Sequence, residues 1–265
     1  MDLAIPNSPT EADGVVAEFI EDAWLQGEAR SVAGDVLSGL QHFAPMLRRG
    51  LPDSWRLYGT WSRQEVPSRA RPLLPDQVLA MAGFSLHMGE IGMAALLLIS
   101  FNGMLRPSEA FVTSRQCSFD LSRGLCHIDL GLTKSGKRFS ISEHVIIDEL
   151  EGVILLSRVL AGQPAGAELF PGGHARFRRL FNQLVLKIGA SSDLYKPYSL
   201  RRGGLTHHWR TLGSLGQTTD RGRWRHQITA RIYLQEGVAM LDRKGLSQAE
   251  KSRIKIGISH LRRLV

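Results

Sequence analysis

Cysteine is scarce in this chain, with only Cys117 and Cys126 among 265 residues. Two thiols form neither a disulfide framework nor the ligand set of a structural zinc site. The sequence therefore predicts free thiols, buried or half-buried on neighbouring strands of a hairpin. Free thiols fit a reducing compartment, so we expect an intracellular protein, nuclear in a eukaryote and cytoplasmic otherwise.

A signal-peptide pattern and long apolar runs are not apparent in the sequence either. The first residues are acidic and are not followed by a basic and then an apolar region, so no signal peptide is expected. The apolar stretch IGMAALLLISF at residues 91–101 is too short to span a bilayer. It predicts a buried helix, and we expect no membrane partner.

Basic residues are abundant. The chain has 33 Lys and Arg against 25 Asp and Glu, a formal net charge of +8, and 43% of its residues are hydrophobic. A basic chain with enough apolar residues for a core favours a polyanionic partner, either nucleic acid or an acidic membrane surface. Seven arginines crowd one segment: Arg201, Arg202, Arg210, Arg221, Arg223, Arg225 and Arg231.

The pattern of apolar residues and turn signals divides the chain into four parts. Residues 1–14 are predicted to be disordered, 15–66 to form a helical domain, 67–75 to be a linker, and 76–265 to form a second domain. The fold class is mainly α with a small antiparallel β-sheet (α+β).

Local patterns predict the elements of the second domain. A helix starts at Pro75, and another is expected after the turn at 103–107, capped by Ser108. Strands are predicted at 116–119, 125–130 and 139–145. Further helices are predicted at 91–102, 149–160, 175–188, 201–211, 228–241 and 247–264.

The segment Lys134-Ser135-Gly136-Lys137-Arg138 lies between two predicted strands, where its ammonium groups can reach a phosphate from a hairpin tip. Residues 131–137 also match most of the P-loop pattern. However, Arg138 replaces the metal-binding Ser or Thr, and a strand follows where a P-loop needs a helix. A third alternative is a polar hairpin turn.

Other candidates are an arginine and a tyrosine far apart in the sequence. Arg106 follows the predicted buried helix and can project into a cleft, or can simply pair with Glu109 at the surface. Arg201 offers the planar fork that binds phosphate oxygens in pairs. Tyr233 can form a covalent intermediate if its surroundings activate it.

Taken in order, these residues resemble the catalytic set of the tyrosine recombinase (phage integrase) family. The resemblance covers roughly residues 72–241, and the preceding helices resemble a shortened core-binding domain. The Leu-Arg-Arg-Gly-Gly box at 200–204 is similar to recombinases of the DIRS and Crypton mobile elements. The set is Gly103-x-x-Arg106-x-x-Glu109, Lys134, Tyr198-x-x-Arg201, Trp224 and Tyr233.

The resemblance implies a site-specific DNA recombinase or integrase that cleaves and rejoins DNA through a 3′-phosphotyrosine link, without metal, ATP or another cofactor. Tyr233 would be the nucleophile, and Arg106 and Arg201 would grip the phosphate oxygens. Lys134 would be the general acid, and Trp224 would orient the phosphate. Additional DNA or phosphate contacts are expected from Lys137, the runner-up general acid, and from Arg202, Arg223, Arg225 and His226.

One position departs from the family pattern. Tyr198 stands where the family usually has histidine, and a tyrosine hydroxyl cannot relay protons near neutral pH. A catalytically impaired DNA-binding relic is therefore the alternative. A metal site built from His207, His208 and His226 is disfavoured because no carboxylate or cysteine lies at ligand spacing.

The family resemblance also suggests partners. Double-stranded DNA is the expected ligand, and self-association into a dimer or tetramer on DNA is expected through the C-terminal helix at 247–264. In the family this helix docks on a neighbouring protomer. The alternative is that it packs on its own domain.

Overall fold

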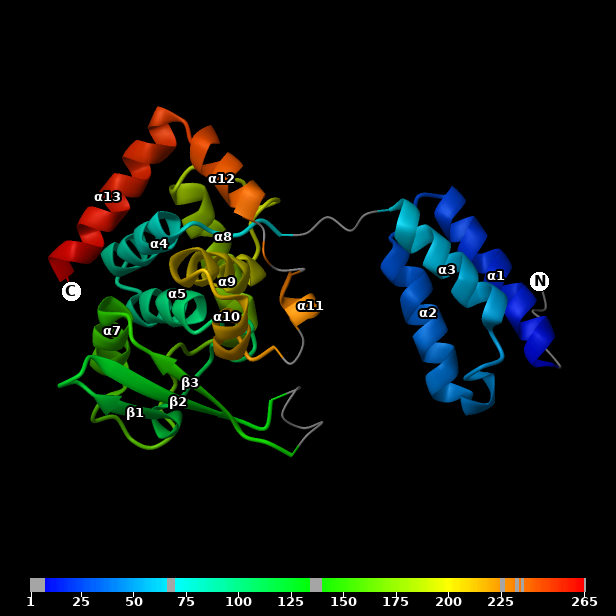
Figure 1. Ribbon diagram of the computed structural model, residues 1–265, viewed down its shortest axis with the longest axis horizontal. Coiled ribbons are helices and arrows are strands. Elements are labelled where there is room, and N and C mark those ends of the chain that lie inside the picture. Colours follow the sequence, from blue (N-terminus) through cyan, green and yellow to red (C-terminus); the bar gives the residue numbers. More distant parts are fainter. Residues whose placement is uncertain are drawn as a thin grey trace. The chain divides into compact units, whose positions relative to one another are not determined.

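The computed structural model describes residues 8–65, 70–133, 140–224, 227–231, 234 and 236–264. The chain forms two compact units, Met1–Arg69 and Ala70–Val265 (Figure 1). It is mainly α-helical with one small antiparallel sheet, which confirms the predicted fold class.

The first unit is a bundle of three α-helices that pack against one another around a small apolar core. Leu37 and Trp61 are among its buried side chains. Pro9 and Pro52 start two of the helices, where a missing backbone N–H costs nothing. The elements are α1 (Pro9–Leu25), α2 (Arg30–Phe43), the 3₁₀ turn η1 (Pro45–Leu47) and α3 (Pro52–Gln64).

The predicted disorder of residues 1–14 is wrong for residues 9–14, which belong to α1. Ser8 caps this helix by accepting the N–H of Glu11 at 3.1 Å. Asp13 is buried and accepts the N–H groups of Asp53 and Ser54, both at 2.9 Å, at the start of α3. These long-range bonds stabilise the first turns of α1, and a local pattern does not reveal them.

The second unit is built around α5, in which every residue from Met93 to Phe101 is buried. Helices α4, α7 and α9 pack against it. The α-helices of this unit are α4 (Pro75–His87), α5 (Ile91–Asn102), α7 (Leu150–Leu160), α8 (Gly173–Lys187), α9 (Tyr198–Leu212), α10 (Leu215–Arg221), α11 (Gln227–Arg231), α12 (Glu236–Gly245) and α13 (Gln248–Leu264).

A three-stranded antiparallel sheet lies beside α7 in the order β1-β2-β3 (Figure 1). Its inner face buries Cys126, Ile128, Val145 and Ile147 against the core. The two free cysteines lie on neighbouring strands, as predicted. The strands are β1 (Cys117–Asp120), which follows the 3₁₀ turn η2 (Ser114–Gln116), β2 (Leu125–Gly131) and β3 (Glu143–Ile147).

Two helix predictions are wrong. Residues 103–110 form turns rather than leading into a helix capped by Ser108, because the Glu109 carboxylate binds Arg106 instead of lying free in a first turn. The single helix predicted at 228–241 is two helices, since α11 ends at Arg231 and α12 begins at Glu236.

The C-terminal helix α13 packs on α4 of its own unit. The helices touch at a pair of glycines, where a Cβ on Gly83 would lie 1.8 Å from the carbonyl oxygen of Gly257. Ile254 and Leu261 are buried in the same contact. This packing matches the alternative in which the helix packs on its own domain, and docking of the helix on a neighbouring protomer stays a prediction.

The predicted linker is shorter than 67–75. Arg71 and Leu73 donate backbone N–H bonds to the carbonyls of Leu194 and Ser199, at 2.9 and 3.2 Å. Leu73 and Leu74 are buried, so the second unit begins at Ala70. Within the part of the chain that the structure describes, no helix is long and apolar enough to cross a membrane.

Candidate active site

Helix α9 places Arg201 inside the second unit, one helical turn after Tyr198. The glycines that follow explain how it can lie so deep. A Cβ on Gly203 would lie 2.2 Å from the carbonyl oxygen of Leu73, and one on Gly204 would lie 1.9 Å from that of Phe101. The Gly-Gly pair thus allows the close packing of α9 against the backbone of Leu73 and Phe101.

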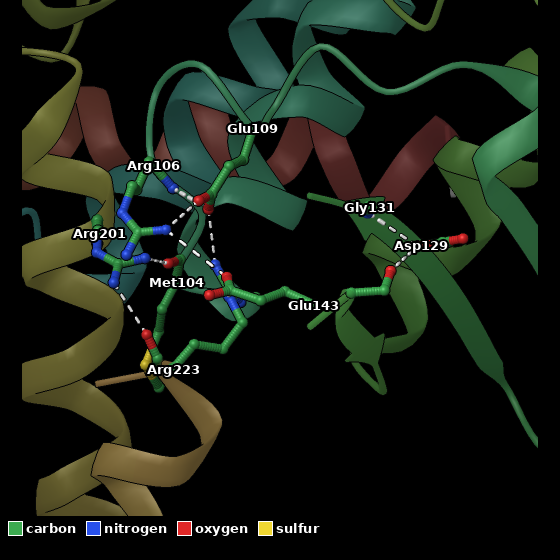
Figure 2. A network of polar contacts seen from close by, with 11 residues as sticks. Met104, Arg106, Glu109, Asp129, Gly131, Glu143, Arg201 and Arg223 are labelled. Atoms are coloured by element: carbon green, nitrogen blue, oxygen red, sulfur yellow. Dashed lines mark hydrogen bonds and ion pairs between the residues drawn. The ribbon is translucent and has the colours of Figure 1, made fainter. Parts of the chain in front are cut away.

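Arg201 is only 1% exposed, and its guanidinium joins three segments (Figure 2). Its Nη1 donates to the carbonyl oxygen of Met104, and its Nη2 donates to that of Gly222 at 2.9 Å. The group also lies 4.0 Å from the centroid of the Trp224 ring. A cation over an indole face is attracted by the ring's quadrupole.

Burial, followed by the neighbouring cations of Arg223 and Arg106, lowers the pKa of Arg201 to about 10. The group is therefore still charged at neutral pH but lies in an unfavourable positive environment. Its buried Nε has no hydrogen-bond partner among the described residues. An anion bound here would relieve both penalties.

Arg106 lies in the turn after α5 and is bound by a carboxylate. Its backbone N–H donates to Glu109 Oε2 at 2.8 Å, and its Nη1 donates to Glu109 Oε1. Glu143 Oε2 lies 3.7 Å from the same nitrogen. The Arg106 side chain keeps 24% of its surface exposed, so solvent and ligands can reach it. The alternative in which Arg106 only pairs with Glu109 at the surface accounts for that bond. It does not account for the burial of Glu109 and Glu143.

Arg223 connects the two carboxylates (Figure 2). Its Nη2 donates to Glu109 at 2.7 Å, its Nε donates to Glu143 at 3.2 Å, and its Nη1 donates to the carbonyl of Gly103 at 3.2 Å. It is 9% exposed and adopts a left-handed φ of 59°. Its contacts are those of a clamp within the protein, rather than of a residue projecting toward DNA.

Burial raises the pKa of Glu109, but Arg223 and Arg106 outweigh it and hold that pKa below its usual range. Glu109 is thus an anion at neutral pH that links two cations. We call the set of Arg106, Arg201, Arg223, Glu109 and Glu143 the arginine cluster. It has one more cation than anion, which favours a bound phosphate.

The sheet contributes to the cluster through the start of β3. Glu143 pairs in register with Gly131, the last residue of β2. The Asp129 carboxylate accepts the N–H of Gly131 at 2.8 Å and stabilises this strand end (Figure 2). The two strand ends that flank residues 134–139 are therefore joined to Arg106 and Arg223.

Trp224 folds back over Arg201 because Gly222 leaves room for it. A Cβ on Gly222 would lie 1.7 Å from the indole ring. The backbone N–H of Trp224 donates to the carbonyl of Thr219 at 2.9 Å, which anchors the turn after α10. The structure thus brings together Arg106, Arg201 and Trp224, with Tyr198 one turn away on α9.

Arg202 lies apart from the arginine cluster. It is 4% exposed, and its Nη1 donates to the carbonyl of Ala70 at 3.3 Å. This contact stabilises the start of the second unit. Five other predicted site residues lie outside the described residues: Lys134, Lys137, Arg225, His226 and Tyr233.

Two alternatives can be compared with the structure. The described residues after the P-loop-like segment enter strand β3, whereas a P-loop lysine must be followed by a helix, so the nucleotide-binding alternative lacks its required context. In the described part of the chain, no group of three or more His, Cys, Asp or Glu side chains can hold a metal ion.

Sequence reasoning missed Glu143 and the roles of Gly222 and Met104. Glu143 carries no local signal, because an acidic residue at a strand start is common. Gly222 had a weak signal, since a glycine two residues before a candidate tryptophan suggests a tight turn. The carbonyl of Met104 is a backbone group, and no side-chain motif points to it.

Comparisons with known proteins agree with this geometry at the level of the fold. No protein-family model and no curated protein sequence matches the chain. Among solved structures, the chain is similar to site-specific recombinases and integrases. It therefore has the fold of the tyrosine recombinase catalytic domain, preceded by a short helical unit.

Two of these solved structures are the transposon Tn1549 integrase and the XerH recombinase. The integrase, in complex with a circular-intermediate DNA, has a TM-score of 0.58 and 14% identity, covering 88% of this chain and 85% of the integrase. XerH, bound to its difH substrate, has a TM-score of 0.51 and 11% identity, covering 86% and 75%. At these identities the likeness concerns the fold alone.

Proposed function

We propose that this protein is a site-specific DNA recombinase or integrase that cuts and rejoins DNA through Tyr233. The observation that carries the proposal is the arginine cluster: Arg201 lies against the Trp224 ring, and Arg106 pairs with Glu109 of the same cluster, in the fold of enzymes that break and rejoin DNA. A buried excess of positive charge is suited to one negatively charged phosphodiester.

The proposed reaction is a phosphoryl transfer that conserves the phosphodiester bond. The Tyr233 hydroxyl releases its proton to solvent, its oxygen attacks the phosphorus, the bond to the 5′-oxygen breaks, and a 3′-phosphotyrosine forms. Lys134 donates a proton to the departing 5′-oxygen, with Lys137 as the runner-up for this role. Attack by a 5′-hydroxyl on the phosphotyrosine reverses the step, so neither a metal nor a nucleotide is consumed.

The described residues take separate roles in this proposal. Arg106, which is partly exposed, and Arg201, through its Nε and its positive charge, would stabilise the charge that develops on the phosphate oxygens. Trp224 would orient the phosphate with its indole N–H while its ring holds Arg201 in place. Tyr198 would donate a hydrogen bond from the start of α9. Arg223 would act as a positioning residue for Arg106.

The remaining assignments complete the proposal. Arg225 and His226 would contact the DNA backbone, whereas the contacts of Arg202 favour a structural role. The first unit would serve as the shortened core-binding region, and copies would associate on DNA.

One specific observation favours a second candidate, a DNA-binding relic with the same fold. Arg201 gives donors to two backbone carbonyls and Tyr198 replaces histidine, so the site can bind a phosphate more readily than it can relay a proton. Both candidates bind DNA, and only covalent chemistry separates them.

The test is a nicked suicide substrate that carries a DNA site selected by binding to the protein. We expect a covalent protein–DNA adduct with the wild type and none with Tyr233→Phe. Tyr58→Phe is the matched control, because it removes a tyrosine hydroxyl from the first unit, and it should leave the adduct unchanged.

A second variant separates the enzyme from the relic more sharply. Tyr198→His restores the residue that usually occupies this position in the family, so we expect adduct to form faster. If neither the wild type nor Tyr198→His forms an adduct on a site that both bind, the enzyme proposal fails and the relic stands.

A further inference from the structure

Charge is divided unequally between the two units. Residues 1–69 hold ten acidic and six basic residues, a net charge of −4, whereas residues 70–265 hold 15 acidic and 27 basic residues, a net charge of +12. A DNA-binding surface needs an excess of cations to replace the counterions of the phosphates. The negative sign of the first unit is therefore unexpected for a module that only clamps DNA.

The negative charge is concentrated on α1. All five charged residues of this helix are acidic, and only Asp13 is buried. The basic residues of the described first unit, namely Arg30, Arg48, Arg49, Arg56 and Arg63, lie on α2, on α3 and in the segment between them. Half of the acidic residues of this unit thus lie on one helix, and its described basic residues lie off that helix.

Apolar side chains accompany the acidic residues near the C-terminal end of α1. Leu25 is 78% exposed and Trp24 is 48% exposed. They line a groove of about 170 Å³ between α1 and α3, together with Leu57 and Trp61. We call Glu18, Glu21, Asp22, Trp24 and Leu25 the α1 surface. Exposed apolar residues ringed by charges of one sign are typical of a protein-binding site.

The same chain carries a surface of matching character on α13. The side of α13 opposite to its contact with α4 exposes Lys251, Lys255, Ile256, Arg262 and Arg263. We call these residues the outer face of α13. Ile256 is 49% exposed between the cations. The outer face is thus basic and partly apolar, whereas the α1 surface is acidic and partly apolar.

We propose that the α1 surface of one copy binds the outer face of α13 of a second copy. Ile256 would contact the apolar groove, and the cations around it would pair with Glu18, Glu21 and Asp22. The helix stays on its own α4, so this contact exchanges no element between the copies.

Such a contact is head-to-tail, because it joins two different surfaces of identical chains. Contacts of this type close into rings or extend into filaments, depending on the rotation between neighbours. The charge pairs at its rim would make it sensitive to salt and would determine its register. The inference extends the proposed function to assembly but needs neither DNA nor the chemistry of Tyr233.

The test measures sedimentation of the full chain without DNA over a range of protein and salt concentrations. We expect association that grows with protein concentration and weakens with salt. Two variants reverse one surface each: Glu18→Lys with Asp22→Lys on α1, and Lys255→Glu with Arg263→Glu on α13. Each variant alone should associate about 100-fold more weakly, because like charges then face each other.

Mixing the two variants is the decisive arm. The unaltered α13 of the first variant faces the unaltered α1 of the second, so the mixture should associate although neither variant does so alone. Asp35→Lys on α2 and Arg178→Glu on α8, both exposed, are the matched controls and should associate like the wild type.

Three results would overturn the proposal. They are unchanged association of either surface variant, a mixture that stays monomeric, and a salt-sensitive compaction that does not depend on protein concentration, which would mean a contact within one chain. The folding control is circular dichroism, which tests whether each variant is folded. Adduct formation by Tyr233 is measured separately, so failure of this assembly and failure of the proposed reaction are distinguishable.

Discussion

The arginine side chains of the second unit differ in how far their contacts within the protein leave them able to bind a phosphate. Arg223 gives its donors to two carboxylates and a carbonyl, so it is a structural clamp although its position in the sequence suggests a DNA contact. Arg106 is held on one side and exposed on the other. Arg201 is almost fully enclosed and is kept charged next to other cations. The proposed phosphate grip therefore depends on the acidic residues that hold the arginines apart.

Gly222 allows us to test whether Trp224 positions Arg201. Gly222→Ala would place a methyl group inside the indole ring, so we expect Trp224 to leave Arg201 and stability to fall by about 1–3 kcal/mol, as in overpacked sites. The urea unfolding of the variant measures the cost, and the adduct assay measures the effect on the site.

Gly216→Ala on α10 is the matched control. A Cβ there would lie 3.9 Å from its nearest neighbour, so this variant should be as stable as the wild type or slightly more so. Equal unfolding of the two alanine variants would contradict the role given to Gly222.

The Glu109 carboxylate should make the stability of the second unit depend on pH. Its pKa is lowered in the folded protein from an ordinary value of 4.5, so its contribution is complete above that value and is lost as pH falls through the folded pKa. We expect Glu109→Gln to cost about 3 kcal/mol at pH 7, as for other broken buried pairs, and progressively less in acid.

The measurement is the difference in unfolding free energy between the wild type and Glu109→Gln, followed from neutral to acidic pH. Glu168→Gln, at an exposed position, is the control and should show a small difference throughout. A cost of Glu109→Gln that is the same at neutral and acidic pH would contradict this account.

Helix α13 packs closely on α4. Its contact with α4 depends on two glycines facing each other, because any side chain there would meet backbone atoms. The amphipathic pattern of α13 is visible in the sequence. It cannot show which partner covers the apolar side, since a second copy and a helix of the same chain satisfy the pattern equally.

Gly257→Ala should disturb this crossing. The added Cβ would lie 2.6 Å from the carbonyl oxygen of Ala80, so we expect a loss of about 1–3 kcal/mol and faster amide exchange along α13. Hydrogen exchange locates the change. Gly237→Ala on α12 has nothing within 4 Å of the new Cβ and is the control. Unaltered exchange of α13 in the Gly257 variant would refute the close crossing.

For DNA binding by the whole molecule, the sign of the net charge on each unit matters more than the net charge of the chain. The net charge of +8 combines a positive second unit with a negative first unit. Binding to DNA should therefore reside mainly in residues 70–265, and the acidic α1 should face away from the phosphates. Under the two proposals above, this division would let one basic chain bind both DNA and a copy of itself.

The salt dependence of DNA binding tests this division. For the full chain we expect DNA affinity to fall by about 10³-fold between low and near-physiological salt, because several phosphate contacts release counterions. Reversing acidic residues of α1, as in Glu18→Lys with Asp22→Lys, should leave the slope unchanged if α1 faces away from DNA. Fluorescence anisotropy with labelled duplex measures the slope. A flat response of the wild type would refute DNA binding by either proposed function.

Local information in the sequence was enough for much of the fold. Periodicity and turn signals, which depend on neighbours a few residues apart, predict the helix at 91–102, the three strands and the helix at 201–211. The resemblance of Arg106, Arg201 and Trp224, in their order and spacing, to the catalytic set of the tyrosine recombinase family also implies that these residues share one site.

Only the tertiary structure shows which residues bind these side chains. The clamp of Arg223 on Glu109 and Glu143 joins residues more than 70 positions apart. The burial of Arg202 and the placement of α13 on its own α4 likewise depend on distant partners. A motif shows which groups are present, but their charge state and freedom to bind are set by contacts across the fold, which no local pattern encodes.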